Sequence, residues 1–515
     1  MKVYLMHRDR DFELKARPLP HGVALVQDLE LDTLFAAMAA GDEFLLNVVQ
    51  AALLTSLSDP QEIRYRQDAL ADCLEESTIV REIYAIAVEA IERERKVWGF
   101  TRNRDPEGLL YRSVEVLKMF VGLLTRLRDI ANAGRGTFRS DAFTRLFAML
   151  VRELDNKYFN VVKEHLRKLT FPDGVLISAE LGQGNRGIHY ELRKSPSRKQ
   201  VWKARLRSWR EQLSHKQPSS YVYEIADRDE GGFRALAELR SRGISRIAGA
   251  LAQSTDHILA FFNMLRLESG FYVGCLNLRD RLDEKGEPMC VPEPIFAGNA
   301  ALFCRRLYDV SLSLTVKERV VGNDVDADDK WLVMITGANR GGKSTFLRSV
   351  GQAQLMMQCG LFVSAESFRA NVCSGLFTHF KRGEDASMKS GKLDEELGRM
   401  SMIVDHITPN SIVLFNESFA STNTREGSEI ASGIVRALLE SGIKVFYVTH
   451  LFDLARRFYL AELDTALFLR AERLGDARRT FRLSEGEPLP TSYGEDLYRQ
   501  IFAASSGDTV RDVCT

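Results

Sequence analysis

The sequence predicts two kinds of structure: a mostly α-helical region with a small β insertion, followed by an α/β domain. In the N-terminal half, apolar residues recur at spacings of three and four, which is typical of helices packed along one face. In the C-terminal half, short apolar segments alternate with helical ones, as in a sheet covered by helices. We expect an N-terminal segment at 1–27, the helical domain at 28–295 and the α/β domain at 296–515.

Length and composition are those of an ordinary globular protein. The 515 residues are enough for about three domains of about 150 residues each. Lys plus Arg and Asp plus Glu both number 70, so bulk charge argues neither for nor against a nucleic acid partner. The seven cysteines are scattered and none has C-x-x-C spacing, which predicts a reducing compartment and no zinc site. The N-terminus lacks a signal-peptide core, and no apolar run approaches the roughly 20 residues that span a bilayer. We therefore expect a cytoplasmic protein without a membrane partner.

The N-terminal half carries several amphipathic stripes. Two helices are expected within 28–57, a longer one around 110–124, and others within 138–170 and 233–266. The stripe of the longer helix suits packing along its whole length. A binding groove is an alternative, but a buried core face is the more common role of such a stripe. This stripe is formed by Leu110, Val114, Leu117, Val121 and Leu124.

A β insertion interrupts the helices at about 171–220. Residues 174–181 and 188–192 predict strands, and Gly182–Gly187 between them has the form G-x-G-x-x-G. That pattern binds dinucleotides only where a helix follows. Here a strand follows, so we expect a hairpin loop.

A basic stretch follows the second of these strands. Residues 193–210 hold eight Lys and Arg residues, no acidic residue, and Trp202 and Trp209 between them. This is a plausible phosphate footprint, although a solvated helix face or a contact with acidic residues elsewhere would give the same composition. The candidate DNA-binding residues are Arg193, Lys194, Arg198, Lys199, Lys203 and Arg205.

The α/β half begins with a motif for phosphate. The strand 332–336 runs into a segment of the form G-x-x-x-x-G-K-[ST], and a helix follows, which is the context that a P-loop requires. Its glycines let backbone N–H groups surround phosphate oxygens. Lys343 should reach the β- and γ-phosphates of ATP, and Ser344 should bind Mg²⁺. The motif comprises Gly337, Ala338, Asn339, Arg340, Gly341, Gly342, Lys343, Ser344 and Thr345.

Two later strands also end in polar residues. The apolar strand 411–415 leads into Asn416 and Glu417, the arrangement of a Walker B motif with Asn in place of the usual Asp. Asn416 keeps an oxygen for Mg²⁺ but loses the charge, and Glu417 can orient or deprotonate the attacking water. The strand 443–449 ends at His450, where ABC-type ATPases place a histidine against the γ-phosphate. Further strands are expected at 374–380 and 465–470, helices at 344–358, 392–407 and 425–441, and a polar turn at 322–330.

With these pieces placed, the chain resembles the MutS family of DNA mismatch-repair ATPases over roughly 300–500. Gly337–Thr345 resembles that family's Gly-Pro-Asn-Met-Gly-Gly-Lys-Ser-Thr, and Phe377–Asp385 resembles its Phe-Thr-Arg-Ile-Gly-Ala-x-Asp. Asn416–Gly427 resembles its Asp-Glu-x-Gly-x-Gly-Thr-Ser-x-x-Asp-Gly. Shorter matches are Phe362–Ala365, Thr449-His450 and Ser492–Gly494.

The resemblance implies an ABC-type P-loop ATPase domain after a helical core and lever whose insertion grips DNA. It implies a homodimer in which ATP is sandwiched between one subunit's P-loop and the other's signature segment, here placed at Ser390 and Gly391. The expected function is an ATP-dependent DNA-binding clamp with ATPase activity in DNA repair. We expect a short form without the mismatch-reading domain, since Phe12-Glu13 is not the spaced Phe-x-Glu motif.

Other departures from the family pattern leave alternatives open. Ala338 and Arg340 replace Pro and Met, and Ser418-Phe419-Ala420 stands where glycines are expected. Asn416 favours a second interpretation, a nucleotide-binding scaffold that hydrolyses little. A third is an ABC-type module coupled to a transporter or a translation factor, against which the helical half argues.

Overall fold

The computed structural model describes residues 1–14, 21–100, 105–172, 174–185, 187–193, 224–296, 298, 300–382, 391–473 and 479–489. The chain divides into two compact units. The first consists of Met1–Val3, Arg81–Gly136 and Arg145–Arg266. The second consists of Tyr4–Val80, Thr137–Thr144 and Leu267–Thr515.

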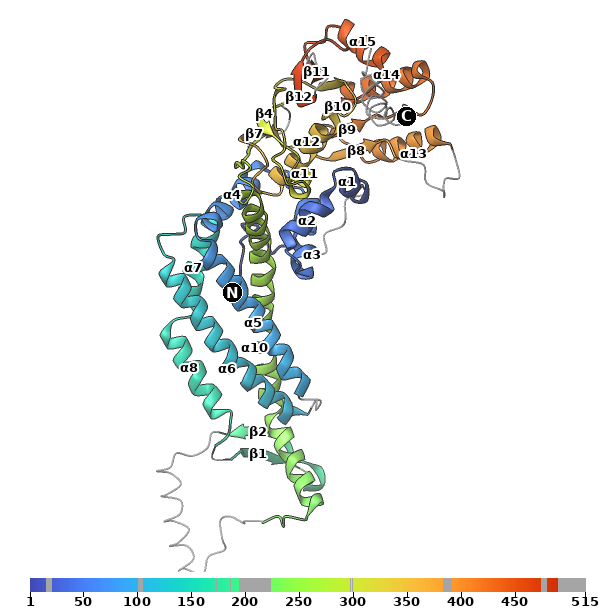
Figure 1. Cartoon of the computed structure of the whole chain (residues 1–515). Helices are drawn as coiled ribbons and strands as arrows, with labels where there is room; N and C mark the ends of the chain where they lie inside the picture. The colour runs from blue at the N-terminus through green and yellow to red at the C-terminus, as the bar shows by residue number, and fades with distance from the viewer. Residues whose placement is uncertain are drawn as a thin grey trace, which may run out of the picture. The chain divides into compact units, whose positions relative to one another are not determined.

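The first unit is built on long helices (Figure 1). They are α5 (Ser77–Phe100), α6 (Pro106–Ala133), α7 (Asp141–Glu153), α8 (Asn156–Lys168) and α10 (Glu230–Asp283), of which α5, α7 and α10 extend into the second unit. A buried ion pair of 2.9 Å joins Arg112 of α6 to Glu94 of α5. On another side of α6, the rings of Phe120 and Phe262 of α10 lie 5.2 Å apart. The predicted stripe on α6 is therefore a core face, because all five of its residues are buried.

A two-stranded hairpin also belongs to this unit. The strands β1 (Leu176–Leu181) and β2 (Gly187–Arg193) pair antiparallel, and a 3₁₀ turn at Gln183–Asn185 lies between them. The G-x-G-x-x-G segment is thus a hairpin loop, as predicted. The hairpin packs on α10, where a Cβ at Gly243 would lie 2.5 Å from the side chain of Ile177.

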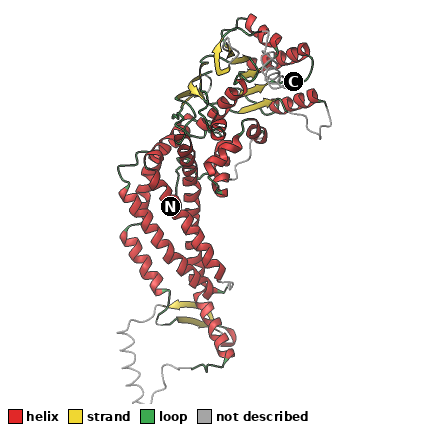
Figure 2. Ribbon diagram, viewed as in Figure 1, coloured by secondary structure: helices red, strands yellow, loops and turns green. Residues whose placement is uncertain are grey.

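The second unit contains a six-stranded mixed sheet of order β12-β11-β6-β10-β9-β8 (Figure 2). Five strands run parallel, and β12 is antiparallel to β11. Their bounds are β6 Leu332–Gly337, β8 Leu376–Phe380, β9 Ile412–Asn416, β10 Lys444–Val448, β11 Ala466–Arg473 and β12 Arg479–Glu485. This confirms the predicted α/β fold, although β12 was not predicted.

The register of the parallel strands aligns their carboxyl ends. Val448 pairs with Ile335 on one side and with Asn416 on the other, and Asn416 pairs with Phe380. Residues that follow β6, β8, β9 and β10 therefore emerge at one edge of the sheet, which is where open α/β sheets bind ligands.

Helices cover both faces of this sheet. On one face, α13 (Lys392–Val404), α14 (Thr424–Glu440) and α15 (Phe452–Leu460) share a buried apolar cluster with the strands. On the other face, α12 (Lys343–Gln358) contacts β9 and β10. It approaches so closely that a Cβ at Gly351 would lie 2.8 Å from Leu414. Alternate residues of the central strands therefore face opposite apolar layers, which explains the nearly continuous apolar runs of β6 and β9.

A second sheet of order β3-β7-β4-β5 was not predicted. Its strands are β3 Glu293–Ile295, β4 Leu302–Leu307, β5 Asn323–Asp326 and β7 Ser367–Asn371. The expected polar turn at 322–330 is wrong in part, because it contains β5. Burial alternates along β5, with Asn323 and Val325 inside and the two aspartates outside, so four Asp residues in this region concealed an edge strand.

Further helices of the second unit have between 6 and 16 residues. They are α1 Gly22–Asp28, α2 Leu31–Ala39, α3 Glu43–Leu54, α4 Pro60–Glu75 and α11 Val310–Thr315. Within the described part of the chain, no helix combines the length and the apolar character that a bilayer crossing requires.

Candidate functional site

The glycine-rich loop lies between the end of β6 and the start of α12. Gly337 and Gly342 adopt φ values of +106° and +88°, which side chains with a Cβ rarely take. Neighbouring backbone also approaches both residues. A Cβ at Gly337 would lie 2.8 Å from the amide nitrogen of Ala471, and one at Gly342 would lie 3.1 Å from the carbonyl oxygen of Phe481. Glycine is therefore required at both ends of the loop.

Lys343 is the first residue of α12 and lies inside the curve of this loop. Its side chain is buried, and Nζ donates hydrogen bonds to the carbonyl oxygens of Gly337 at 3.0 Å and Ala338 at 2.9 Å. Burial lowers the pKa of Lys343 to about 8, and Arg479 acts in the same direction, whereas Glu417 opposes the change. A buried ammonium group at a helix N-terminus suits an anion, because both the charge and the helix dipole favour it.

Ser344 connects this loop to the end of β9. Its Oγ donates a hydrogen bond of 2.9 Å to Oδ1 of Asn416. Two oxygen atoms are thus held together beside the helix N-terminus. Oxygen donors suit a hard cation such as Mg²⁺, so the pair fits that ion, with one negative charge fewer than a Ser–Asp pair would supply.

Glu417 and His450 meet at the same edge. Nε2 of His450 lies 2.9 Å from Oε1 of Glu417, and the Glu417 amide donates to the carbonyl oxygen of Val448 at 2.9 Å. The hydrogen bond with His450 is the main cause that lowers the pKa of Glu417; Lys343 and Lys381 add to it, against the effect of burial. The carboxylate is therefore ionised at neutral pH and able to accept a hydrogen bond from water.

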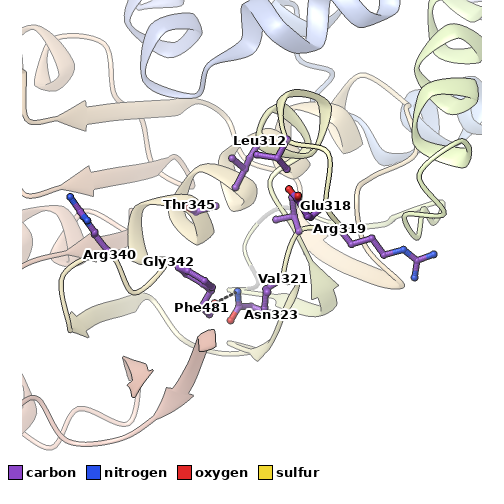
Figure 3. Close-up of a pocket in the computed structure, with 11 residues that line it drawn as sticks. Leu312, Glu318, Arg319, Val321, Asn323, Arg340, Gly342, Thr345 and Phe481 are labelled. Atoms are coloured by element: carbon purple, nitrogen blue, oxygen red, sulfur yellow. Dashed lines mark hydrogen bonds between the residues drawn. The ribbon is translucent and has the colours of Figure 1, made fainter. Parts of the chain in front are cut away.

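A pocket of about 560 Å³ opens beside the loop (Figure 3). Arg340, Gly342 and Thr345 line it from the loop and α12, and Phe481 lines it from β12. The opposite wall comes from Leu312 of α11 and the segment 316–323. Asn323 fixes the two walls to each other: its Oδ1 accepts from the Leu483 amide at 2.7 Å, and its Nδ2 donates to the Phe481 carbonyl oxygen at 3.3 Å.

Of the signature and DNA-binding residues singled out from the sequence, two lie within the described part of the chain. Gly391 is the exposed N-cap residue of α13, and Ser390 is not described. Arg193 ends β2, where it donates to Ser178 Oγ at 2.8 Å and pairs with Glu191 at 3.0 Å. Outside the described residues lie Lys194, Arg198, Lys199, Lys203 and Arg205.

Sequence reasoning missed part of the site. Lys381 directly follows β8, and the rule that parallel strands end at one edge could have identified it. Phe481, Asn323 and Arg479 come from segments that were read as a turn or left unassigned. No local signal marks them, because pairing between distant strands brings them to the loop.

Comparison of the sequence with known protein families assigns the chain to one of them. Residues 58–285 match the family model of the MutS2 N-terminal domain, and residues 333–495 match that of MutS domain V. The chain belongs to the MutS family. The second match covers the glycine-rich loop, Asn416, Glu417 and His450 together.

Several curated relatives share these regions. The DNA mismatch repair protein MutS of Leptospira interrogans is 30% identical over 187 residues, which is 33% of this chain and 22% of the relative. MutS of Thermotoga neapolitana is 37% identical over 178 residues, 34% of this chain and 22% of the relative. Endonuclease MutS2 of Lacticaseibacillus casei is 28% identical over 260 residues, 49% of this chain and 32% of the relative. The chain thus covers between about a fifth and a third of the length of these relatives.

Proposed function

We propose that this chain is an ATP-dependent DNA-binding protein of the MutS type, a cytoplasmic homodimeric clamp with ATPase activity that acts in DNA repair. One observation carries the proposal. Lys343, the Ser344–Asn416 pair and the Glu417–His450 pair converge at one edge of one sheet, in a region that matches MutS domain V.

In this proposal the glycine-rich loop is a P-loop of the ABC type. Gly337–Thr345 surrounds the phosphates of ATP, and Lys343 exchanges its bonds with the loop carbonyls for the β- and γ-phosphates. Ser344 and Asn416 hold Mg²⁺, which neutralises phosphate charge when bound. Glu417 orients the attacking water and accepts its proton, and His450 holds the Glu417 carboxylate and contacts the γ-phosphate.

The pocket beside the loop is proposed to take the adenine base. The pocket is lined by Thr345 and Gly342, so a base bound there would lie directly beside the phosphate loop. Phe481 supplies an aromatic surface and Arg340 a cation. The sequence had not indicated the residues that contact the base.

The clamp would close when ATP joins two subunits. Ser390 and Gly391 of one subunit would contact the γ-phosphate of the ATP that the other subunit binds. ADP lacks this phosphate and would therefore leave the clamp open. The hairpin β1–β2 and the basic stretch from Arg193 to Arg205 would bind the DNA backbone. Their positive charges would attract its phosphates whatever the base sequence.

Two measurements test the clamp. The mass in solution should double when a non-hydrolysable ATP analogue replaces ADP, and labelled homoduplex, mismatched and four-way-junction DNA should be retained at low salt. A lone subunit at saturating analogue, without retention of any of the three DNAs, would refute the proposal. That result would favour the ABC-type module of a transporter or a translation factor.

A second candidate function is a nucleotide-binding scaffold with little hydrolysis. The bond between Ser344 and the uncharged Asn416 favours it, because the magnesium site lacks a carboxylate at that position. Multiple turnover of Mg-ATP that is lost in Glu417→Gln would rule the scaffold out.

A further inference from the structure

The backbone that carries Glu417 has an unusual conformation. Glu417 and Phe419 adopt φ values of +55° and +60°, in the left-handed region that favours glycine. The MutS-family pattern has a glycine at the position of Phe419, so the chain keeps the conformation without the residue that allows it freely. Other contacts must hold this loop in place.

Backbone contacts hold the loop from two sides. Glu417 N–H donates to the Val448 carbonyl at 2.9 Å, and the hydroxyl of Tyr447 donates to the Ser418 carbonyl at 2.8 Å. On the far side, a Cβ at Gly427 would lie 2.3 Å from the carbonyl oxygen of Phe419, so the loop rests directly on α14. These bonds restrain the loop but do not by themselves favour a positive φ at a phenylalanine.

The side chain of Phe419 supplies the remaining anchor. Its ring is fully buried and stacks on the ring of His379, with centroids 5.1 Å apart and planes 18° apart. Burial of a whole aromatic side chain favours the one backbone conformation that allows it. His379 lies on β8, so the contact joins the Glu417 loop to a neighbouring strand of the sheet.

His379 is held in one tautomer by its own contacts. Nε2 lies 2.9 Å from the carbonyl oxygen of Glu396, which only accepts, so Nε2 carries the proton. The hydroxyl of Ser418 donates to the carbonyl oxygen of His379 at 2.5 Å, and the same Oγ lies 2.7 Å from Nδ1 of the ring. Burial lowers the pKa of His379 to about 4, which keeps the ring neutral at physiological pH. The imidazole thus binds the residue between Glu417 and Phe419 and stacks on Phe419 itself.

Two departures from the family pattern therefore touch each other. This chain has His379 where the family's Phe-Thr-Arg has its arginine, and Phe419 where the family's Asp-Glu-x-Gly has its glycine. The two side chains stack on each other. We infer that His379 and Phe419 form a compensating pair of positioning residues that holds Glu417 for hydrolysis. This inference rests on the function proposed above.

A double-mutant cycle on the full chain tests whether His379 and Phe419 are coupled. Phe419→Gly and His379→Arg should each lower kcat for Mg-ATP about tenfold, whereas KM and the Kd of a non-hydrolysable analogue stay within about twofold. The double variant restores the family pattern at both positions and should recover most of the lost kcat, because the two effects are coupled.

A smaller change guards against loss of folding. Ser418→Ala removes one hydroxyl and should lower kcat severalfold at unchanged KM. Phe458→Ala is the matched control, since it empties a buried aromatic site on α15 and should lower stability while kcat remains.

The outcomes separate the inference from the proposed function. Normal kcat in both single variants, together with loss of turnover in Glu417→Gln, would overturn the inference alone. Additive losses in the double variant would overturn it as well. A wild-type protein without measurable turnover would overturn the proposed function and this inference with it.

Discussion

Two loops at the same edge of the sheet both contain residues in the left-handed backbone region, but different features of the chain allow this conformation in each. The loop after β6 takes positive φ values at Gly337, Arg340 and Gly342, and at two of these three positions a glycine adopts the conformation without strain. The loop after β9 takes them at Glu417 and Phe419 and relies on buried contacts with a neighbouring strand. The first solution is visible in the sequence as a motif, whereas the second is visible only in the packing.

The difference bears on function. The first loop has to leave backbone groups open to a phosphate, so side chains would obstruct it. The second loop has only to aim one carboxylate, and it can be filled with side chains on the side away from the site. We therefore expect substitutions in the first loop to affect nucleotide binding and those in the second to affect the hydrolytic step.

The largest effect on binding is expected for Lys343→Ala. Loss of the buried ammonium group removes charge-assisted contacts with the phosphates, and ATP affinity should fall on the order of 100-fold. Titration calorimetry with a non-hydrolysable analogue measures it. Lys330→Ala, which changes a half-buried lysine before β6 whose Nζ donates to the Asp464 carbonyl oxygen, is the control. Unchanged affinity in Lys343→Ala would refute the assignment of the phosphate site.

A stability effect should distinguish required from tolerated glycines. Gly337→Ala places a Cβ against the Ala471 amide at a φ of +106°, so the free energy of unfolding should fall by about 2 kcal/mol or more. Gly433→Ala in α14 meets nothing within 4 Å and should raise it by about 0.5–1 kcal/mol. Chemical denaturation of both variants compares them, and equal values would contradict the role given to the loop backbone.

Asn416→Asp should help to distinguish an ATP-hydrolysing clamp from a nucleotide-binding scaffold. A carboxylate in place of the amide adds a charge to the Ser344 partner, so the Mg²⁺ concentration for half-maximal turnover should fall up to about tenfold. The measurement is kcat as a function of Mg²⁺ concentration. No change would mean that Asn416 does not hold the ion.

The smallest expected signal is a proton. Lys343 has a pKa of about 8 in the free protein, so it is mostly neutral at pH 8.5 and mostly charged at pH 7. A bound triphosphate favours the charged form. Binding should therefore take up a fraction of a proton at pH 8.5 and close to none at pH 7. Calorimetry in buffers of different ionisation enthalpy detects the difference, and equal uptake at both pH values would contradict it.

The sequence predicted the elements whose signals are local. The strand–loop–helix around Lys343 is a contiguous pattern, and the apolar stripe of α6 and the hairpin at Gly182–Gly187 are equally local. The motif patterns at the ends of three predicted strands also assigned Ser344, Glu417 and His450 to one phosphate site.

The rest depended on contacts between distant segments. The strand β5 was concealed by its aspartates because pairing with β4, rather than β-propensity, makes it a strand. Phe481 lies at the pocket because β12 pairs antiparallel with β11, and no sequence motif predicts this pairing. The stacking of His379 on Phe419 links positions 40 residues apart, so neither residue looked functional alone.

The proposed hydrolysis depends on Glu417, the carboxylate that the loop after β9 holds at the carboxyl edge of the sheet. The direct test is steady-state hydrolysis of Mg-ATP by the wild-type chain and by Glu417→Gln, with analogue binding measured on both. We expect kcat to fall by about a hundredfold to ten-thousandfold while analogue affinity is kept. Equal turnover in the two proteins would contradict the account.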